Sequence, residues 1–409
     1  MTVAMTLLAG TGYLLAGRAL SGARHRWRDA AWALLNFVAV YFLFFSDKNP
    51  LFLAPYVLLV CAQFLVLRWA GARGGWRLWT AFCTPLVVLV AVRYVPPSAY
   101  AGLVGPLSER LRAEPGFSFG SYFIGVSYLA FRTSYLVLEV RNGVVPPPGF
   151  WAYLGFAFFA PTLSVGPISP YSRHRCAFAE TDRPQIPPGR ALLRLLVGLV
   201  KFKFLGVLLN QLSYAGLLLD GHPHPWIDLP VAAAAYYLYL YCNFSGMCDI
   251  AIGAAGLMGI SVAENFDNPL GARNMKDFWN RWHITLSHYM RDVVFSPLSK
   301  ALVRALGPAH ANQAVALTIL VVFLLVGIWH GVGGNFVAFG AAQALGVVTV
   351  HYYTLGLKRW LGRAGYKAYH ASRLIQALGV AITFCYFSAT LAFFANTFAE
   401  LKEILAGLR

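Results

Sequence analysis

Hydrophobic residues fill most of this chain in long blocks that are separated by short polar connections. Because a membrane-spanning helix needs about 20 mainly apolar residues, we expect about eleven membrane segments. They fall at residues 3–17, 29–46, 50–67, 78–95, 119–138, 150–168, 190–219, 228–260, 312–332, 335–356 and 373–396. The pattern therefore predicts an all-α polytopic membrane protein with one integral-membrane domain over residues 1–409.

Residues 261–311 interrupt this pattern, because they are too polar to span a membrane and too rich in large apolar side chains for a solvated loop. Their apolar residues recur at helical spacing: Phe278, Trp279, Trp282, Leu286, Tyr289 and Met290. This spacing predicts an amphipathic helix that lies at the membrane surface or dips into the membrane as a re-entrant segment. Irregular backbone at membrane depth is tolerated only inside protein or beside a wet cavity, so we expect a site here.

The composition agrees with a membrane protein, since 58% of the residues are hydrophobic and only 12% are charged. Soluble domains carry about 25% charged residues. The net charge of +17 would suggest a nucleic-acid partner in a soluble protein. Here the cations lie in short loops, which favours membrane lipids as partners, and we expect no nucleic acid.

The basic loops also predict an orientation. Arginines cluster at residues 18–28 and 68–77, whereas residues 47–50 are nearly neutral. The positive-inside rule places both basic loops in the cytoplasm and the N-terminus outside. The first apolar run lacks a basic start, so we expect a retained span and not a cleaved signal.

Two histidines occupy positions where imidazole is costly. His330 ends the run VVFLLVGIWH, and His283 lies within KDFWNRWHITLSHYMRD. A polar side chain at membrane depth indicates function unless it is paired, and histidine takes and returns a proton near neutral pH. A purely structural histidine is the alternative at both positions. His288 lies off the helical face of His283, and we do not expect it to be catalytic.

The two histidine segments, residues 276–298 and the GIWHG of 327–331, resemble the membrane-bound O-acyltransferase family. The resemblance is to the bacterial branch that contains the D-alanyl transfer protein DltB and the alginate O-acetylation protein AlgI. Further similar blocks follow in the same order as in that branch, namely GVSYLAFRTSYLVLEVRNG (125–143), FFAPTLSVGPISPY (158–171), residues 237–269 and LAFFANTFAELKEIL (391–405).

This resemblance implies a ring of roughly eleven helices with re-entrant or interfacial helices around a central tunnel. His330 would be the general base for the acceptor hydroxyl, and His283 would hold the donor carbonyl or the acceptor. A thioester donor is already activated, so a base and a group that stabilises the oxyanion suffice, with no bound cofactor. Glycines beside His330, such as Gly327, would admit a thin pantetheine arm.

Other polar and aromatic residues complete the candidate site. Candidate tunnel residues are Trp282, Trp329, Asn280, Asn243 and Ser287, although both tryptophans also suit interfacial anchors. Asp249 in an apolar block needs a partner, and we expect Arg132 to supply it as a supporting ion pair. Arg291 and Asp292 are expected to form a local polar pair. The cysteines have no metal-like spacing, so no metal is expected.

The sequence departs from the family pattern at three places. Asn243 stands where the family often has an aspartate, and residues 342–344 lack a second His-Gly. Residues 393–396 read FFAN, without the family's arginine. The resemblances to DltB and to AlgI therefore do not identify the substrate.

The expected function is O-acyl transfer to a hydroxyl of an envelope polymer or glycan at the bacterial cytoplasmic membrane. By enzyme class we expect an acyltransferase that transfers acyl groups other than aminoacyl or D-alanyl groups. The DltB-like blocks instead favour D-alanyl, or a similar group, on an acidic phosphopantetheinyl carrier protein that docks on loops 169–194 and 268–311. An acyl-CoA donor and an extracytoplasmic partner protein also stay open.

Three alternatives remain. One is AlgI-like O-acetylation of an exopolysaccharide. Another is a subunit that only conducts an acyl group to a secreted partner. The last, from another class, is a transporter or flippase with a histidine proton relay. Transporters commonly contain internal repeats, and we find no repeat in this sequence.

Overall fold

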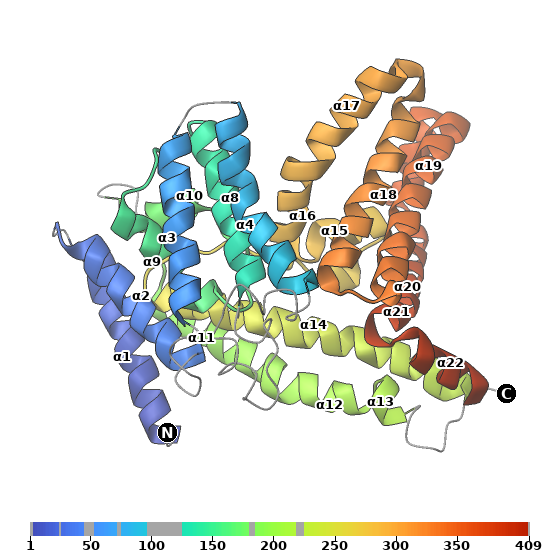
Figure 1. Ribbon diagram of the computed structural model, residues 1–409. Helices are drawn as coiled ribbons and strands as arrows, with labels where there is room; N and C mark the ends of the chain where they lie inside the picture. Colours follow the sequence, from blue (N-terminus) through green and yellow to red (C-terminus); the bar gives the residue numbers. More distant parts are fainter. Residues whose placement is uncertain are drawn as a thin grey trace. The chain divides into compact units, whose positions relative to one another are not determined.

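The computed structural model describes residues 3–23, 26–44, 53–71, 75–95, 125–179, 185–217 and 225–407. Within these ranges helices dominate, and the single β pairing is an isolated bridge between Phe266 and Trp282 (Figure 1). The expected neutral loop at residues 47–50, parts of both basic loops and the start of the expected span 119–138 lie outside the described residues.

Four described stretches are long and apolar enough to cross a membrane. They are α4 (Trp76–Tyr94), residues Pro308–His330 with α18 (Ala311–His330), α19 (Gly334–Ala371), and residues Arg373–Ala395 with α20 (Arg373–Thr390) and α21 (Ala392–Ala395). The all-α membrane class is thus confirmed, whereas the expected count of eleven segments is not.

The helices form two compact units, residues 1–197 with 247–263 and residues 198–246 with 264–409. Unit 1 holds α4 and the end of α14 (Pro225–Leu257). Its other helices are α1 (Val3–Gly22), α2 (Arg28–Phe44), α3 (Leu53–Ala70), α8 (Val126–Arg141), α9 (Phe150–Ala157), α10 (Tyr171–Cys176) and most of α11 (Pro188–Leu199). One part of its core contains the buried Trp32, which stacks on Phe159, together with Met258.

One predicted span of unit 1 is wrong. We expected residues 150–168 to cross the membrane, but α9 has only eight residues and is followed by a 3₁₀ turn at Ala160–Thr162. Eight helical residues rise about 12 Å, well short of the hydrocarbon thickness. Pro161 at the start of the turn has no N–H to continue an α-helix.

Unit 2 contains the start of α14, together with α18 to α21. Its remaining helices are α12 (Gly206–Gln211), α13 (Tyr214–Leu217), α15 (Met275–Arg281), α16 (Ile284–Met290), α17 (Ser296–Leu306) and α22 (Phe398–Gly407). A π-helical turn at Val200–Leu205 joins α11 to α12.

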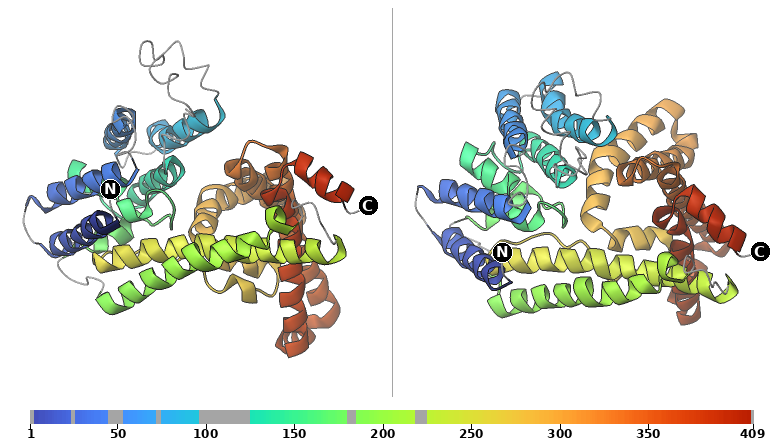
Figure 2. Two further views of the ribbon diagram at one scale, coloured as in Figure 1. Left: turned by 90° about the horizontal axis from the view of Figure 1, so that it is seen from below. Right: turned by 60° about the horizontal axis from the view of Figure 1, so that its bottom comes forward.

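The chain from α11 to α12 runs beside α14, as the green and yellow helices in Figure 2 show. Glycine permits this approach, because a Cβ on Gly246 would lie only 2.9 Å from the carbonyl oxygen of Gly198. Small residues at such positions let membrane helices approach closely. The stretch 190–260, which was difficult to divide from sequence, therefore consists of two neighbouring helical stretches.

The amphipathic helix that was expected within residues 261–311, with apolar residues from Phe278 to Met290, is broken. Phe278, Trp282, Leu286 and Tyr289 are buried as the spacing predicts. However, α15 ends at Arg281 and α16 begins at Ile284, so two residues between them leave the helix. One of these two residues is His283.

Candidate active site

His283 lies at the break between α15 and α16. Trp282 has extended backbone, and His283 adopts the left-handed conformation with φ 46° and ψ 50°. Only one other described non-glycine residue, Asn268, has a positive φ. A left-handed residue with a Cβ costs roughly 1–2 kcal/mol and persists where its surroundings hold it.

Asn265 provides that hold from a buried position 18 residues earlier. Its backbone oxygen accepts a hydrogen bond from Ile284 N at 3.0 Å. Its side-chain Oδ1 accepts from Thr285 N at 3.2 Å and from Thr285 Oγ1 at 2.8 Å, and it lies 3.1 Å from His283 Nδ1. Asn265 was not among the residues selected from sequence, because a single asparagine in a polar loop gives no signal.

Two aromatic residues lie beside the His283 ring. The rings of Phe244 and Trp329 lie 4.7 Å and 6.2 Å away between centroids. His283 is only 3% exposed, and its Nε2 has no hydrogen-bond partner among the described residues. Burial, and to a lesser extent the charge of nearby His330, lower the pKa of His283 to about 3. The ring is therefore neutral near pH 7.

His330 is the last residue of α18, where Gly331 turns the backbone into an extended conformation. Its ring lies 4.5 Å from Trp329, 4.9 Å from Phe394 and 6.1 Å from Phe339. Phe394 belongs to the FFAN stretch, so that family block also reaches the histidine. Unit 2 thus brings His283, Trp329 and His330 into one cluster.

The two candidate tryptophans have different surroundings. Trp329 lies next to both histidine rings. Trp282 is 5% exposed, with its ring stacked on Phe278 at 5.5 Å and against Phe266 at 5.0 Å. Its clearest role is to anchor the break beside His283 in the aromatic core of unit 2.

The three remaining tunnel candidates lie on α16, α15 and α14. Ser287 donates a hydrogen bond to the carbonyl oxygen of Trp279 at 3.0 Å, which ties α16 to α15. Asn280 is exposed on α15. Asn243 lies on α14 where a Cβ on Gly206 would come within 3.8 Å of its backbone nitrogen. Their substrate contacts stay predictions.

The expected ion pair between Asp249 and Arg132 is wrong. Arg194 Nε binds Asp249 Oδ1 at 3.0 Å instead. Buried Arg132 donates to the carbonyl oxygen of Phe156 and to Thr162 Oγ1, both at 3.2 Å. The sequence contains the charges but does not tell which helix faces which. The expected local pair of Arg291 and Asp292 is confirmed at 3.0 Å.

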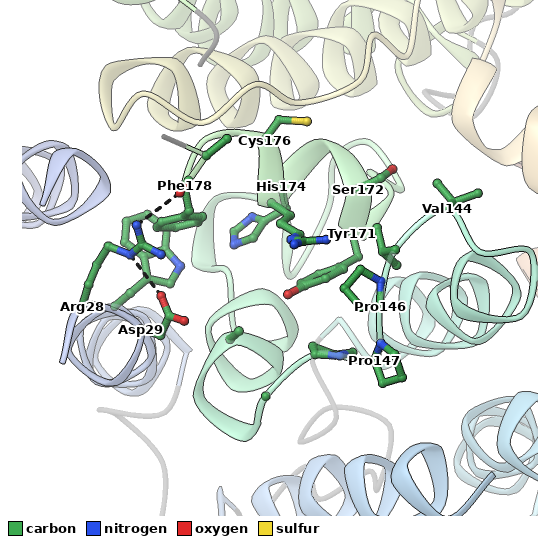
Figure 3. A pocket seen from close by; sticks show the side chains of 17 residues that line it. Arg28, Asp29, Val144, Pro146, Pro147, Tyr171, Ser172, His174, Cys176 and Phe178 are labelled. Atoms are coloured by element: carbon green, nitrogen blue, oxygen red, sulfur yellow. Dashed lines mark hydrogen bonds and ion pairs between the residues drawn. The ribbon is translucent and has the colours of Figure 1, made fainter. Parts of the chain in front are cut away.

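Two large cavities lie elsewhere. One, of about 880 Å³ in unit 2, is lined by α15, α19 and α20. The other, of about 690 Å³ in unit 1, is shown in Figure 3, where Arg28 donates to the carbonyl oxygen of Phe178 and pairs with Asp29. His174 lines it, and burial followed by the charge of Arg132 lowers its pKa to about 3. Neither cavity lining includes His283 or His330.

Among the described residues, no group of three or more His, Cys, Asp and Glu side chains is placed to hold a metal ion.

In a comparison with known protein families, residues 127–395 match the model of the membrane-bound O-acyltransferase family. A teichoic acid D-alanyltransferase of Streptococcus thermophilus is 32% identical over 281 residues, covering 64% of this chain and 65% of the relative. A peptidoglycan O-acetyltransferase of Helicobacter pylori is 30% identical over 50% of this chain and 39% of the relative. A probable alginate O-acetylase AlgI of Pseudomonas aeruginosa is 27% identical, with 64% and 46% covered. The chain matches less than two thirds of each relative's length.

Proposed function

The chain belongs to the membrane-bound O-acyltransferase family, and from this premise we propose that it transfers an acyl group from a thioester to a hydroxyl of a cell-envelope polymer or glycan. Family membership and four long apolar helices make it a multi-pass membrane protein. The family match confirms the resemblance to this family that we recognised in the two histidine segments. The single observation that best supports the activity is the cluster of His283, Trp329 and His330 within unit 2.

The proposed reaction needs a base and a group that stabilises the oxyanion, but no covalent protein intermediate. The acceptor oxygen attacks the thioester carbonyl carbon while His330 takes its proton. The carbon–sulfur bond then breaks, and the thiolate leaves with the proton that His330 returns. The rings of Trp329, Phe339 and Phe394 lie beside the half-buried His330, and such an apolar environment strengthens electrostatic interactions.

The proposed donor is a D-alanyl group, or a similar one, on a phosphopantetheinyl carrier protein. Support comes from a relative named as a teichoic acid D-alanyltransferase with 32% identity. The enzyme class expected from the sequence left out D-alanyl groups. This relative corrects that exclusion, and D-alanyl groups belong among the candidate acyl groups. An acidic carrier would meet a strongly basic protein of net charge +17, and complementary charge speeds encounter. O-acetyl transfer is the alternative, supported by the peptidoglycan and alginate relatives.

The test is donor consumption by the purified protein in nanodiscs. D-alanyl carrier protein, acyl carrier protein and acetyl-CoA are offered as labelled thioesters. We expect loss of one thioester, reduced roughly 100-fold or more by His330→Ala. His288→Ala is the matched control, because this exposed histidine lies on α16 close to the site and should keep full turnover. Full turnover by His330→Ala would remove it as the base.

A further inference from the structure

Three hydrogen-bond donors converge on one oxygen beside His283. The backbone N–H of Thr285 can only donate, so the atom that it contacts in Asn265 at 3.2 Å must be the carboxamide oxygen. That contact fixes the orientation of the Asn265 side chain. The same oxygen lies 3.1 Å from His283 Nδ1.

This geometry fixes the tautomer of His283. A carboxamide oxygen only accepts hydrogen bonds, so His283 Nδ1 must carry the ring proton. A neutral imidazole has one such proton, and His283 is buried and neutral. Its Nε2 is therefore a lone-pair acceptor. It is buried and has no partner among the described residues, and the centroid of its ring lies 6.2 Å from that of Trp329.

An acceptor-only Nε2 excludes one of the two roles expected for His283. A thioester carbonyl needs a hydrogen-bond donor, which this nitrogen is not. The role that remains is to hold a substrate N–H or O–H. Because the ring resists protonation, it suits a group that keeps its hydrogen throughout the reaction, unlike the attacking hydroxyl. A pantetheine arm carries such a group in the amide nearest the sulfur.

We propose that Asn265 is a positioning residue that holds His283 as its Nδ1–H tautomer, so that Nε2 accepts a hydrogen bond from the pantetheine amide N–H next to the thioester. This rests on the proposed function, because it requires a pantetheine thioester as donor. The hydrogen bond places the thioester carbonyl relative to His330. Carrier-bound and CoA-bound donors share this amide, so the contact recognises the arm whatever bears it.

The test replaces the amide N–H by CH₂. The carrier or CoA that wild-type protein consumes is loaded with either the natural arm or this analogue, and kcat/KM is measured for both. We expect wild type to prefer the natural arm roughly 10- to 100-fold, the range for leaving a buried acceptor unsatisfied. In His283→Ala this preference should fall to about onefold, because the acceptor is gone.

Asn265→Leu should lose the same preference, because His283 is then free to take the other tautomer. Thr285→Val is the matched control, since it removes another donor to the same oxygen without touching the imidazole, and it should keep the preference. Nitrogen-15 NMR of histidine-labelled protein, with His283→Ala to assign the signal, should show a protonated Nδ1 in wild type. This readout holds even if Asn265→Leu folds poorly.

Each outcome separates the two proposals. If no thioester is consumed, the proposed function fails. If the natural donor is consumed but wild type treats both arms alike, the amide contact is wrong. A wild-type preference that survives in His283→Ala assigns the amide to another residue. If wild type treats both arms alike and His283→Ala lowers turnover equally on both, Nε2 holds the acceptor hydroxyl instead. A proton on Nε2 in the NMR spectrum overturns the tautomer.

Discussion

Replacing Gly327 by alanine tests whether the packing of α18 on α19 positions His330. Gly327 lies on α18, three residues before His330. A Cβ there would meet the backbone oxygen of Phe336 at 2.3 Å and the backbone of Gly340 at 3.2 Å. The facing Gly340 is equally tight, with the carbonyl oxygen of Phe323 only 2.4 Å from its own would-be Cβ. Backbone atoms cannot rotate away, so the helices must separate.

The required separation follows from these distances. Ordinary van der Waals contact begins at 3.4 Å, so the end of α18 must shift by about 1 Å. His330 lies less than one helical turn from Gly327 and moves with it. A misplacement of about 1 Å can cost roughly 100-fold in rate. We expect Gly327→Ala to lower turnover by about that factor while the protein remains folded.

The assay is turnover of the accepted thioester in nanodiscs, together with the thermal midpoint of unfolding. Gly356→Ala is the matched control, because Gly356 lies within α19 and nothing comes within 4 Å of its would-be Cβ. This control should keep full turnover and gain up to about 1 kcal/mol from helix propensity. Wild-type turnover in Gly327→Ala would refute the view that this contact places His330.

Two further predictions concern histidines. His174 has a pKa lowered to about 3 from 6.5 by burial and by the Arg132 charge, so the stability it contributes is full above pH 6.5 and is lost as pH falls toward 3. His174→Phe should therefore flatten part of the decline in thermal midpoint between pH 7 and pH 5, and an unchanged decline would contradict this. His283→Gly should be about 1 kcal/mol more stable than His283→Ala, because only glycine is relaxed in the left-handed conformation, and equal midpoints would mean that no strain is held there.

Periodicity predicted most of the buried apolar residues between Phe278 and Met290, but not how their backbone runs. Apolar residues repeat at helical spacing whether or not one residue between them turns left-handed. The break at His283 depends on hydrogen bonds from Asn265, 18 residues away. Contacts that join distant parts of the chain leave no mark on local spacing. The same holds for Asp249, whose partner Arg194 lies on a helix that the sequence does not align with it.

The glycines beside His330 were expected to make room for a substrate arm. In the structure, other protein atoms lie close to each of these glycines. Gly327 meets the backbone of α19, and a Cβ on Gly331 would overlap the ring of Phe336. Glycine in a membrane helix indicates close approach, but the sequence does not tell whether a ligand or another helix approaches. Here the close approach is between helices, which makes these glycines determinants of where His330 lies.

Local preferences and the observed structure disagree most at His283, and this disagreement points to function. A histidine in left-handed backbone, buried with an unsatisfied nitrogen, costs stability in two ways at once. A fold that needed only a turn between α15 and α16 would be better served by glycine. The costs persist because Asn265 fixes the ring and the neighbouring aromatic residues enclose it. Strain that surrounding contacts maintain, at a position next to a second histidine, is what a preorganised binding site requires, and it supports our proposal that His283 contacts the substrate.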